Sequence, residues 1–259
     1  MNSLKQTSQW RVVAASVCGK SHQQKQQLCQ DAHAWQILPD NILIAAIADG
    51  AGSASMGKIG AIVAAQTAVA NICAGTVTRR ILDDDTSVRL LLIEALVAAK
   101  QAVMEEAIAC EKQIHDLATT LIVLIATPEM VAAAQIGDGV AVVKDFAGNV
   151  FALTQPQNGE YINETTFLVS PDAINTAQLR LLRQVIVNVA LLTDGLQMLA
   201  LNMDSGTPHQ PFFTPLFKFI SDVNDKSDGV NQLVSFLRSE RICDRADDDL
   251  TLLLADISN

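Results

Sequence analysis

Four short apolar segments lie close together in the middle of the chain, and their spacing limits the possible folds more than any other feature. They are Thr119–Ala126, Met130–Ile136, Val140–Val143 and Val150–Leu153. Only a few residues separate them, and those residues include Gly, Pro and Asn, which favour turns. Parallel strands need a crossover connection of a dozen or more residues, so these segments should pair antiparallel, as a meander. They are apolar on both alternating faces, which predicts a sheet covered on both sides.

Other segments have the patterns of strands and helices. The predicted strands are Trp10–Cys18, Asp31–Leu38, Ile42–Asp49, Gln184–Thr193 and Leu250–Asp256. The predicted helices are Gly57–Ile72, Thr86 or Ser87 to about Gln113, Leu196–Leu201, Pro215–Val223 and Val230–Ser239. The polar segment Gly19–Gln30 reads as an exposed connection. No linker or repeat divides the sequence, so we expect one α+β domain over residues 1–259, with two packed antiparallel β-sheets flanked by helices (an α-β-β-α sandwich).

Composition narrows the classes of partner and compartment. The formal net charge is -10, from 28 acidic and 18 basic residues, and an acidic surface repels nucleic-acid phosphates. We find no run of 18 uninterrupted apolar residues, so no membrane span is expected. The segment Met1–Trp10 lacks the apolar core of a secretory signal. Five dispersed cysteines without CxxC spacing predict reduced thiols in a cytoplasmic protein.

Several aspartates lie where predicted strands begin or end. Asp31 opens one strand, Asp49-Gly50 and Asp194-Gly195 each close one, Asp138-Gly139 lies between two, and Asp247-Asp248-Asp249 precedes the last. Each of these pairs alone is explained by turn formation, because Asp-Gly favours tight turns. Brought together by the fold, however, their charges would repel and their burial would be costly. A divalent cation would offset that cost, and oxygen ligands suit magnesium or manganese.

The same residues carry a resemblance to a known family, the metal-dependent protein phosphatases of type 2C. The matching pieces occur in the family's order between about Trp10 and Ile257. They are Cys29-Gln30-Asp31-Ala32, Ala48-Asp49-Gly50-Ala51-Gly52, Ala118-Thr119-Thr120-Leu121, Ile136-Gly137-Asp138-Gly139, Leu192-Thr193-Asp194-Gly195-Leu196 and Asp248-Asp249-Leu250-Thr251. The sequence Asp-Gly-Ala-Gly-Ser at Asp49–Ser53 is similar to the corresponding motif of small single-domain bacterial members.

The resemblance implies a serine/threonine protein phosphatase that uses a metal-activated water. It implies two Mn²⁺ or Mg²⁺ ions and a third, weaker one. Asp49 would bridge two ions, with the Gly50 carbonyl on one of them; Asp194 and Asp248 would be further ligands, and Asp138 would help to hold the third. Asp31 would act at the first ion or beside it, so Asp31, Asp49 and Asp194 are the expected catalytic residues. The implied partners are a phosphoprotein substrate and, where one exists, a cognate kinase.

The choice of Asp248 among three neighbouring aspartates also depends on the resemblance. In an extended chain Asp248 shares a face with Leu250, whereas Asp247 and Asp249 share the opposite face. The spacing does not say which face meets the ions. The family motif is Asp, then Asn or Asp, then an apolar residue, then Thr or Ser, and this motif selects Asp248.

The chain also departs from the family pattern. Many members have an arginine that holds the substrate phosphate where this chain has Lys25-Gln26-Gln27-Leu28. Gln30 replaces a glutamate of some members, and Ala51 replaces a histidine that is a proposed general acid in eukaryotic ones. These departures favour, as an alternative, a pseudophosphatase that binds without turnover.

Two further alternatives rest on short motifs. Gly52–Lys58 has the spacing of a phosphate-binding loop of nucleotide-binding proteins, but Ile59 stands where Ser or Thr should bind magnesium. Cys73 and Arg79 have the spacing of a cysteine-phosphatase loop, but they follow a helical pattern. Among the four histidines, His22 and His33 flank the proposed site and are the ones worth testing.

Overall fold

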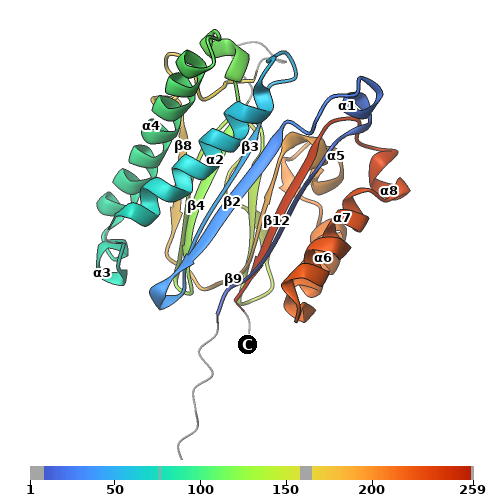
Figure 1. Cartoon of the computed structure of the whole chain (residues 1–259). Helices are drawn as coiled ribbons and strands as arrows, with labels where there is room; N and C mark the ends of the chain where they lie inside the picture. Colours follow the sequence, from blue (N-terminus) through green and yellow to red (C-terminus); the bar gives the residue numbers. More distant parts are fainter. Residues whose placement is uncertain (1–8, 76, 158–164, 258–259) are drawn as a thin grey trace, which may run out of the picture.

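Two five-stranded β-sheets stack face to face, and helices cover the outer face of each (Figure 1). The structure is a computed structural model, and it describes residues 9–75, 77–157 and 165–257. Every strand pairing in the two sheets is antiparallel. The arrangement confirms the predicted α+β sandwich.

The two sheets draw their strands from interleaved parts of the sequence. The first sheet has the order β2-β3-β4-β5-β8 and the second the order β1-β12-β9-β6-β7. The strands of the first sheet are β2 (Asp31–Leu38), β3 (Ile42–Asp49), β4 (Leu121–Thr127), β5 (Met130–Ile136) and β8 (Gln178–Leu182). Those of the second are β1 (Arg11–Val17), β12 (Leu250–Asp256), β9 (Ile186–Leu192), β6 (Val140–Asp145) and β7 (Val150–Ala152). A small ribbon pairs β10 (Leu201–Asn202) with β11 (Thr207–Pro208).

The helices form the two outer layers (Figure 1). Those on the side of the first sheet are α2 (Gly57–Ala74), α3 (Arg79–Leu82) and α4 (Asp85–Ala109). Those on the side of the second are α5 (Gln197–Ala200), α6 (Gln210–Asp222), α7 (Lys226–Leu237) and α8 (Glu240–Cys243). The short α1 (Lys20–Gln24) lies at the end of the sandwich where β2 begins, and three 3₁₀ turns are η1 (Pro39–Asn41), η2 (Ile114–Leu117) and η3 (Asp194–Leu196).

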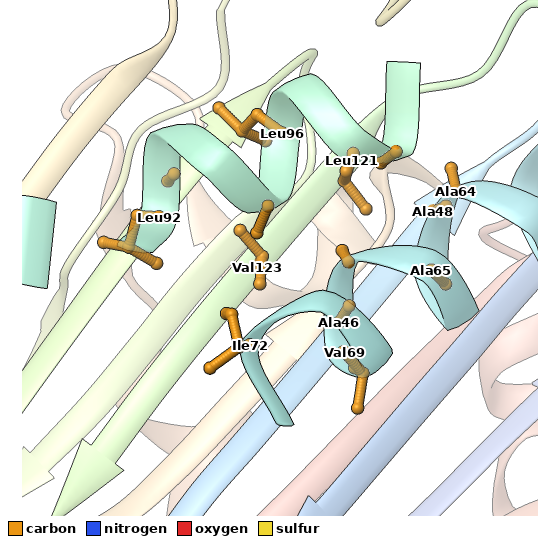
Figure 2. Close-up of a cluster of buried hydrophobic side chains, with 14 of the residues drawn as sticks. Ala46, Ala48, Ala64, Ala65, Val69, Ile72, Leu92, Leu96, Leu121 and Val123 are labelled. Carbon is orange, nitrogen blue, oxygen red and sulfur yellow. The ribbon is translucent and has the colours of Figure 1, made fainter. Parts of the chain in front are cut away.

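Apolar side chains fill the spaces between the layers. The space between the sheets is almost entirely aliphatic and includes the fully buried Leu43, Leu124 and Leu253. Between the first sheet and its helices, α2 presents alanines such as Ala64 and Ala65 beside β3 (Figure 2). Small side chains allow the helix to approach the sheet closely, and burying apolar area of this kind is the main stabilising contribution to folding.

The predicted meander is correct in its two hairpins and wrong in its middle. The β4–β5 and β6–β7 pairs are antiparallel neighbours, but β5 and β6 belong to different sheets. The chain crosses from one sheet to the other through Gly137-Asp138-Gly139, where Gly137 has a positive φ of 103° that side chains rarely adopt. A short separator excludes a crossover helix, but it does not distinguish a hairpin from an arch between stacked sheets.

Several boundaries differ from the prediction. The helix α1 and the strand β8 were not predicted: α1 lies in polar, glutamine-rich sequence, and β8 is a five-residue run shortly before the predicted strand from Gln184. The helix predicted from Pro215 begins at Gln210, with Pro211 in its first turn and Pro215 inside it. Proline is tolerated in a first turn, so Pro211 marks the true start. The helix α4 starts at Asp85, where the Asp84 side chain caps it by accepting a hydrogen bond from Ser87 N.

Helix α2 is long and apolar enough, by length and composition alone, to cross a membrane. It packs against β2, β3 and α4, and its buried face includes Ala61, Ala68 and Ile72. A core helix of a soluble protein passes the same test, so this feature is weak evidence for a membrane span.

Candidate metal centre

The antiparallel topology gathers the predicted aspartates at one end of the sandwich. Antiparallel neighbours begin and end side by side, so the start of β2 meets the end of β3. Asp31 and Asp49 are directly opposite each other in that pair. At the same end, shown at the top of Figure 1, β12 begins and β9 ends. We call this set of strand ends the acidic edge, and its members are Asp31, Asp49, Asp138, Asp194, Asp248 and Asp249.

The second sheet contributes Asp138 and Asp194 to the acidic edge. Val140 of β6 pairs with Leu192 of β9, so the residue two before Val140 lies beside the residue two after Leu192. The negative charges of Asp138 and Asp248 both act on the Asp194 carboxyl, which also shares a hydrogen bond with Asp49. Side chains from both sheets therefore meet at one place.

The pKa values of three carboxyls show the cost of this arrangement. Burial is the largest cause in each case; it raises the pKa of Asp31 to about 8 and that of Asp194 to about 6. It also raises the pKa of Asp49 well above its usual range, with further contributions from the charges of Asp31, Asp194 and Asp248. Burial and like charges both disfavour the ionised form of a carboxyl. A cation bound among these groups would remove the penalty.

The donor atoms fit a divalent cation. Asp31 Oδ1 and Asp194 Oδ1 are buried, and neither has a hydrogen-bond partner among the described residues. A buried polar atom without a partner is costly, and such atoms often mark a missing ion or water. Carboxylate and carbonyl oxygens are the ligands that Mg²⁺ and Mn²⁺ prefer.

The backbone around Asp49 is fixed by two threonines that sequence reasoning did not assign. Thr120 N and the Thr119 hydroxyl both donate to Asp49 O, at 2.8 and 2.9 Å. Asp49 N donates in return to the Thr120 hydroxyl at 3.0 Å. These bonds hold the end of β3 against the start of β4, so the Asp49 side chain leaves the sheet in a fixed direction.

Gly50 lies where only glycine fits. A Cβ on Gly50 would come within 2.4 Å of the Gly57 carbonyl carbon, at the start of α2. The Gln30 amide, oriented with its nitrogen toward the turn, donates to Gly50 O at 3.2 Å and to Ala51 O at 3.0 Å. Gln30, which replaces a glutamate of some family members, thus supports the turn that carries the expected carbonyl ligand.

Asp31 and Asp138 are each held by hydroxyl groups. The Thr193 hydroxyl donates to Asp31 Oδ2 at 2.8 Å, and Thr251 bonds the same carboxyl. The Thr165 hydroxyl donates to Asp138 Oδ2 at 2.7 Å. These threonines were not predicted as site residues, although Thr193 and Thr251 lie inside the quoted motifs. Their contacts depend on how the two sheets are stacked, which the sequence pattern does not show.

The three aspartates before β12 have different surroundings. Asp249 is 2% exposed and accepts hydrogen bonds from Gly19 N at 2.7 Å and Gln30 N at 2.5 Å. Asp248 is exposed, and its charge acts on both Asp49 and Asp194. Asp247 is exposed, and its charge acts on Lys20. Burial thus distinguishes Asp249 from its two neighbours, although one carboxylate oxygen of Asp248 lies within 4.8 Å of one of Asp249.

The two short motifs that suggested other functions, Gly52–Lys58 and Cys73 with Arg79, do not form the sites that those functions need. A phosphate-binding loop of the nucleotide type belongs to a parallel sheet, whereas β3 lies between β2 and β4 with both pairings antiparallel. Cys73 lies in the last turn of α2, outside the acidic edge, and burial raises the pKa of its thiol. His33 points its Nδ1 at the Ser16 hydroxyl, 2.9 Å away.

Comparisons with a family model and with a curated relative both find protein phosphatases. A family model described as protein phosphatase 2C matches residues 18–238. The chain is 37% identical over 253 residues to serine/threonine-protein phosphatase 3 of Escherichia coli strain K12, covering 95% of this chain and 98% of that protein.

Solved structures share the fold at low sequence identity. A bacterial serine phosphatase superposes with a TM-score of 0.68 at 13% identity, covering 96% of this chain and 98% of its own. The serine/threonine phosphatase Stp1 of Staphylococcus aureus gives a TM-score of 0.67 at 14% identity, covering 96% and 95%. At these identities the likeness concerns the fold alone.

Proposed function

This chain belongs to the protein phosphatase 2C family, so it is a protein phosphatase, and we propose that it removes phosphate from phosphoserine and phosphothreonine in proteins. The observation that carries the proposal is the convergence of Asp31, Asp49 and Asp194, whose buried carboxyls repel one another. Structural needs do not explain three such groups at one edge, because each raises the free energy of the folded state.

We propose that Asp49, the Gly50 carbonyl, Asp194 and Asp248 hold two divalent ions, with Asp138 at a third, weaker one. Mn²⁺ or Mg²⁺ fits this oxygen-only donor set. Bound ions of this kind supply activation of a water molecule and neutralisation of the charge that develops on the phosphate. The threonine bonds to Asp49 O support the proposal, because they fix the carboxyl at the centre of the set.

Asp31 is proposed to orient the attacking water. Thr193 and Thr251 hold its carboxyl, while Oδ1 keeps no partner among the described residues. That oxygen is free to accept a hydrogen bond or a proton from the water. Lys25 is exposed and Ala51 has no proton to give, so neither restores the arginine or the histidine of other members. Protonation of the leaving group then falls to solvent at the site.

The proposed partner is a phosphoprotein, together with the kinase that phosphorylates it where one exists. The net charge of -10 supports a protein partner over a nucleic acid. The five dispersed cysteines all lie as free thiols, which supports the cytoplasm as the place of action. A membrane partner is not part of the proposal.

The proposal is tested by turnover. The purified chain should hydrolyse an aryl phosphate and phosphoserine or phosphothreonine peptides with Mn²⁺ or Mg²⁺, and chelator should stop the reaction. Asp194→Asn should lose most of this activity, whereas the matched control Asp204→Asn, at an exposed turn, should keep it. Full activity in excess chelator would contradict the metal mechanism. Folded protein that binds phosphopeptide without turnover under any metal would support the pseudophosphatase.

A further inference from the structure

His22 is the one buried residue of α1, whose other residues are half-buried or exposed. It lies in α1, where Gln23 and Gln24 face solvent, yet only 5% of His22 is exposed. Its ring packs beside the segment that precedes β12, because Ser21 N donates to Asp247 O at 2.9 Å and fixes α1 there. A buried imidazole normally finds a hydrogen-bond partner for each ring nitrogen.

The Nδ1 atom of His22 does not have such a partner among the described residues. It lies 2.9 Å from Asp249 Oδ2, but without the geometry of a hydrogen bond. That oxygen already accepts a bond from Gln30 N, and Asp249 Oδ1 accepts one from Gly19 N. A nitrogen and an oxygen with lone pairs are therefore held close together by the backbone of the loop.

Asp248 completes a set of three possible ligands. One ligand atom from each of His22, Asp248 and Asp249 lies within 4.8 Å of the other two. At the right angle of an octahedral site, two ligand atoms that each lie about 2.1 Å from the ion are about 3.0 Å apart. The 2.9 Å between His22 Nδ1 and Asp249 Oδ2 matches that separation. The unpartnered imidazole is what distinguishes this set from an ordinary acidic cluster.

We propose that His22, Asp248 and Asp249 form a metal site of their own beside the oxygen-only cluster, and that this site takes a transition-metal ion such as Mn²⁺ rather than Mg²⁺. Imidazole nitrogen suits transition ions, whereas Mg²⁺ binds oxygen and keeps much of its water. The Cys18 thiol lies close enough to Asp249 for the charge of that carboxylate to act on it, which adds a soft side chain to the same wall. Asp248 would connect the two sites, since its charge also acts on Asp49 and Asp194.

Pulsed electron paramagnetic resonance on Mn²⁺-loaded protein tests the proposal directly. Mn²⁺ at the oxygen-only cluster has no nitrogen ligand, so coupling to ¹⁴N should arise only from the site that contains His22. We expect this coupling in the wild-type chain and its loss in His22→Asn. Asn can still donate a hydrogen bond toward Asp249, so a purely structural role is kept. The number of Mn²⁺ ions bound per chain in equilibrium dialysis should fall by one in the same variant.

Two controls assign the signal. His33→Asn should keep the ¹⁴N coupling, because His33 bonds Ser16 and is not in the set. Wild-type protein grown with ¹⁵N-histidine should replace the ¹⁴N coupling by a ¹⁵N coupling. The labelled protein carries no substitution, so the test remains decisive even where His22→Asn fails to fold.

The outcomes separate this proposal from the proposed function. Absence of nitrogen coupling in the wild type, or its persistence in folded His22→Asn, would overturn the site and leave His22 as an ion-pair partner of Asp249. Neither result depends on turnover, so the site can stand in a chain that proves inactive and can fail in an active one. Excess Mg²⁺ should displace the Mn²⁺ that shows no ¹⁴N coupling and leave the Mn²⁺ that shows it. Displacement of both ions to the same extent would contradict the proposed selectivity.

Discussion

The space between the two sheets and the acidic edge are built from the same strands and have opposite energetics. Strand β3 is fully buried and apolar from Ile42 to Ala48, and its next residue is Asp49. Between the sheets, each buried apolar side chain contributes about 25 cal/mol per Å² removed from water. At the edge, burial raises the pKa of Asp31 and Asp49, so the ionised carboxyls cost stability.

The comparison indicates that stability and chemistry are separated along each strand. The interior holds the ends of the strands in place, and the edge uses that rigidity to keep repelling charges together. Sites built on strands are more precise than sites on loops. Substitutions in the interior should therefore change stability alone, and substitutions at the edge should change metal binding and activity.

The largest expected effect is that of Asp49→Asn. This substitution removes the charge at the centre of the acidic edge and keeps the shape, so Mn²⁺-dependent turnover should fall at least about 100-fold. The metal-free protein should melt at a higher temperature than the wild type, because a repelling buried charge is gone. Hydrolysis of an aryl phosphate measures the turnover, and thermal unfolding in chelator measures the melting temperature of the metal-free protein. A variant that melts lower in chelator and keeps its activity would break the contrast between interior and edge.

The interior side of the comparison is tested with Leu124→Ala. Leu124 is fully buried in β4 between the sheets, and truncation there leaves a cavity. The free energy of unfolding should fall by about 2–5 kcal/mol. Denaturant unfolding gives this value, and turnover per folded molecule should be unchanged because Leu124 does not touch the edge. A drop in turnover that exceeds the loss of folded protein would show that the two regions are coupled.

The pH dependence of the metal-free protein sharpens the comparison. Asp31 and Asp194 have folded-state pKa values of about 8 and about 6, above the ordinary value near 4. The folded state thus binds protons that the unfolded state has already released, so stability falls as pH rises through this window. Between about pH 5 and about pH 8 we expect a loss on the order of 4 kcal/mol, most of it from Asp31, because water reduces the share of the half-buried Asp194.

Asp31→Asn is the matched variant for this effect. It removes the group with the higher pKa, so its unfolding free energy in chelator should vary less with pH than that of the wild type. Saturating Mn²⁺ should abolish the loss in the wild type, because the ion replaces the protons. Equal pH profiles for the two proteins in chelator would show that burial at the edge does not penalise Asp31.

Much of the fold and the core of the candidate site could be predicted from the sequence, for identifiable reasons. Short separators forced antiparallel pairing, and Asp-Gly pairs marked the strand ends. The crossing at Gly137-Asp138-Gly139 was missed, because the same turn residues serve a hairpin and an arch between sheets. Thr193 and Thr251 were missed as partners of Asp31 for a related reason. Their contacts arise only when the second sheet is stacked on the first.

His22 was noted in the sequence as flanking the site, but its burial could not be predicted. The segment around it is polar and glutamine-rich, which indicates an exposed connection. The structure instead turns α1 against the segment before β12 through the Ser21–Asp247 backbone bond. A local polar pattern does not reveal a side chain that is buried by a residue more than two hundred positions away.

The smallest expected effect concerns Asp249, which lies where the two regions meet. Its carboxylate accepts bonds from Gly19 N and Gln30 N, which belong to the loop that carries α1. Asn keeps one accepting oxygen and turns an NH₂ group toward the other backbone N–H, so one buried donor loses its partner. The free energy of unfolding should fall by about 1–2 kcal/mol. Asp247→Asn, one residue earlier and exposed, should change it by less than about 0.5 kcal/mol. Denaturant unfolding of the two variants in chelator separates their structural effects from metal binding. Equal stability of the two would mean that the bonds from Gly19 N and Gln30 N to Asp249 do not stabilise the loop, and that the Ser21–Asp247 backbone bond holds it instead.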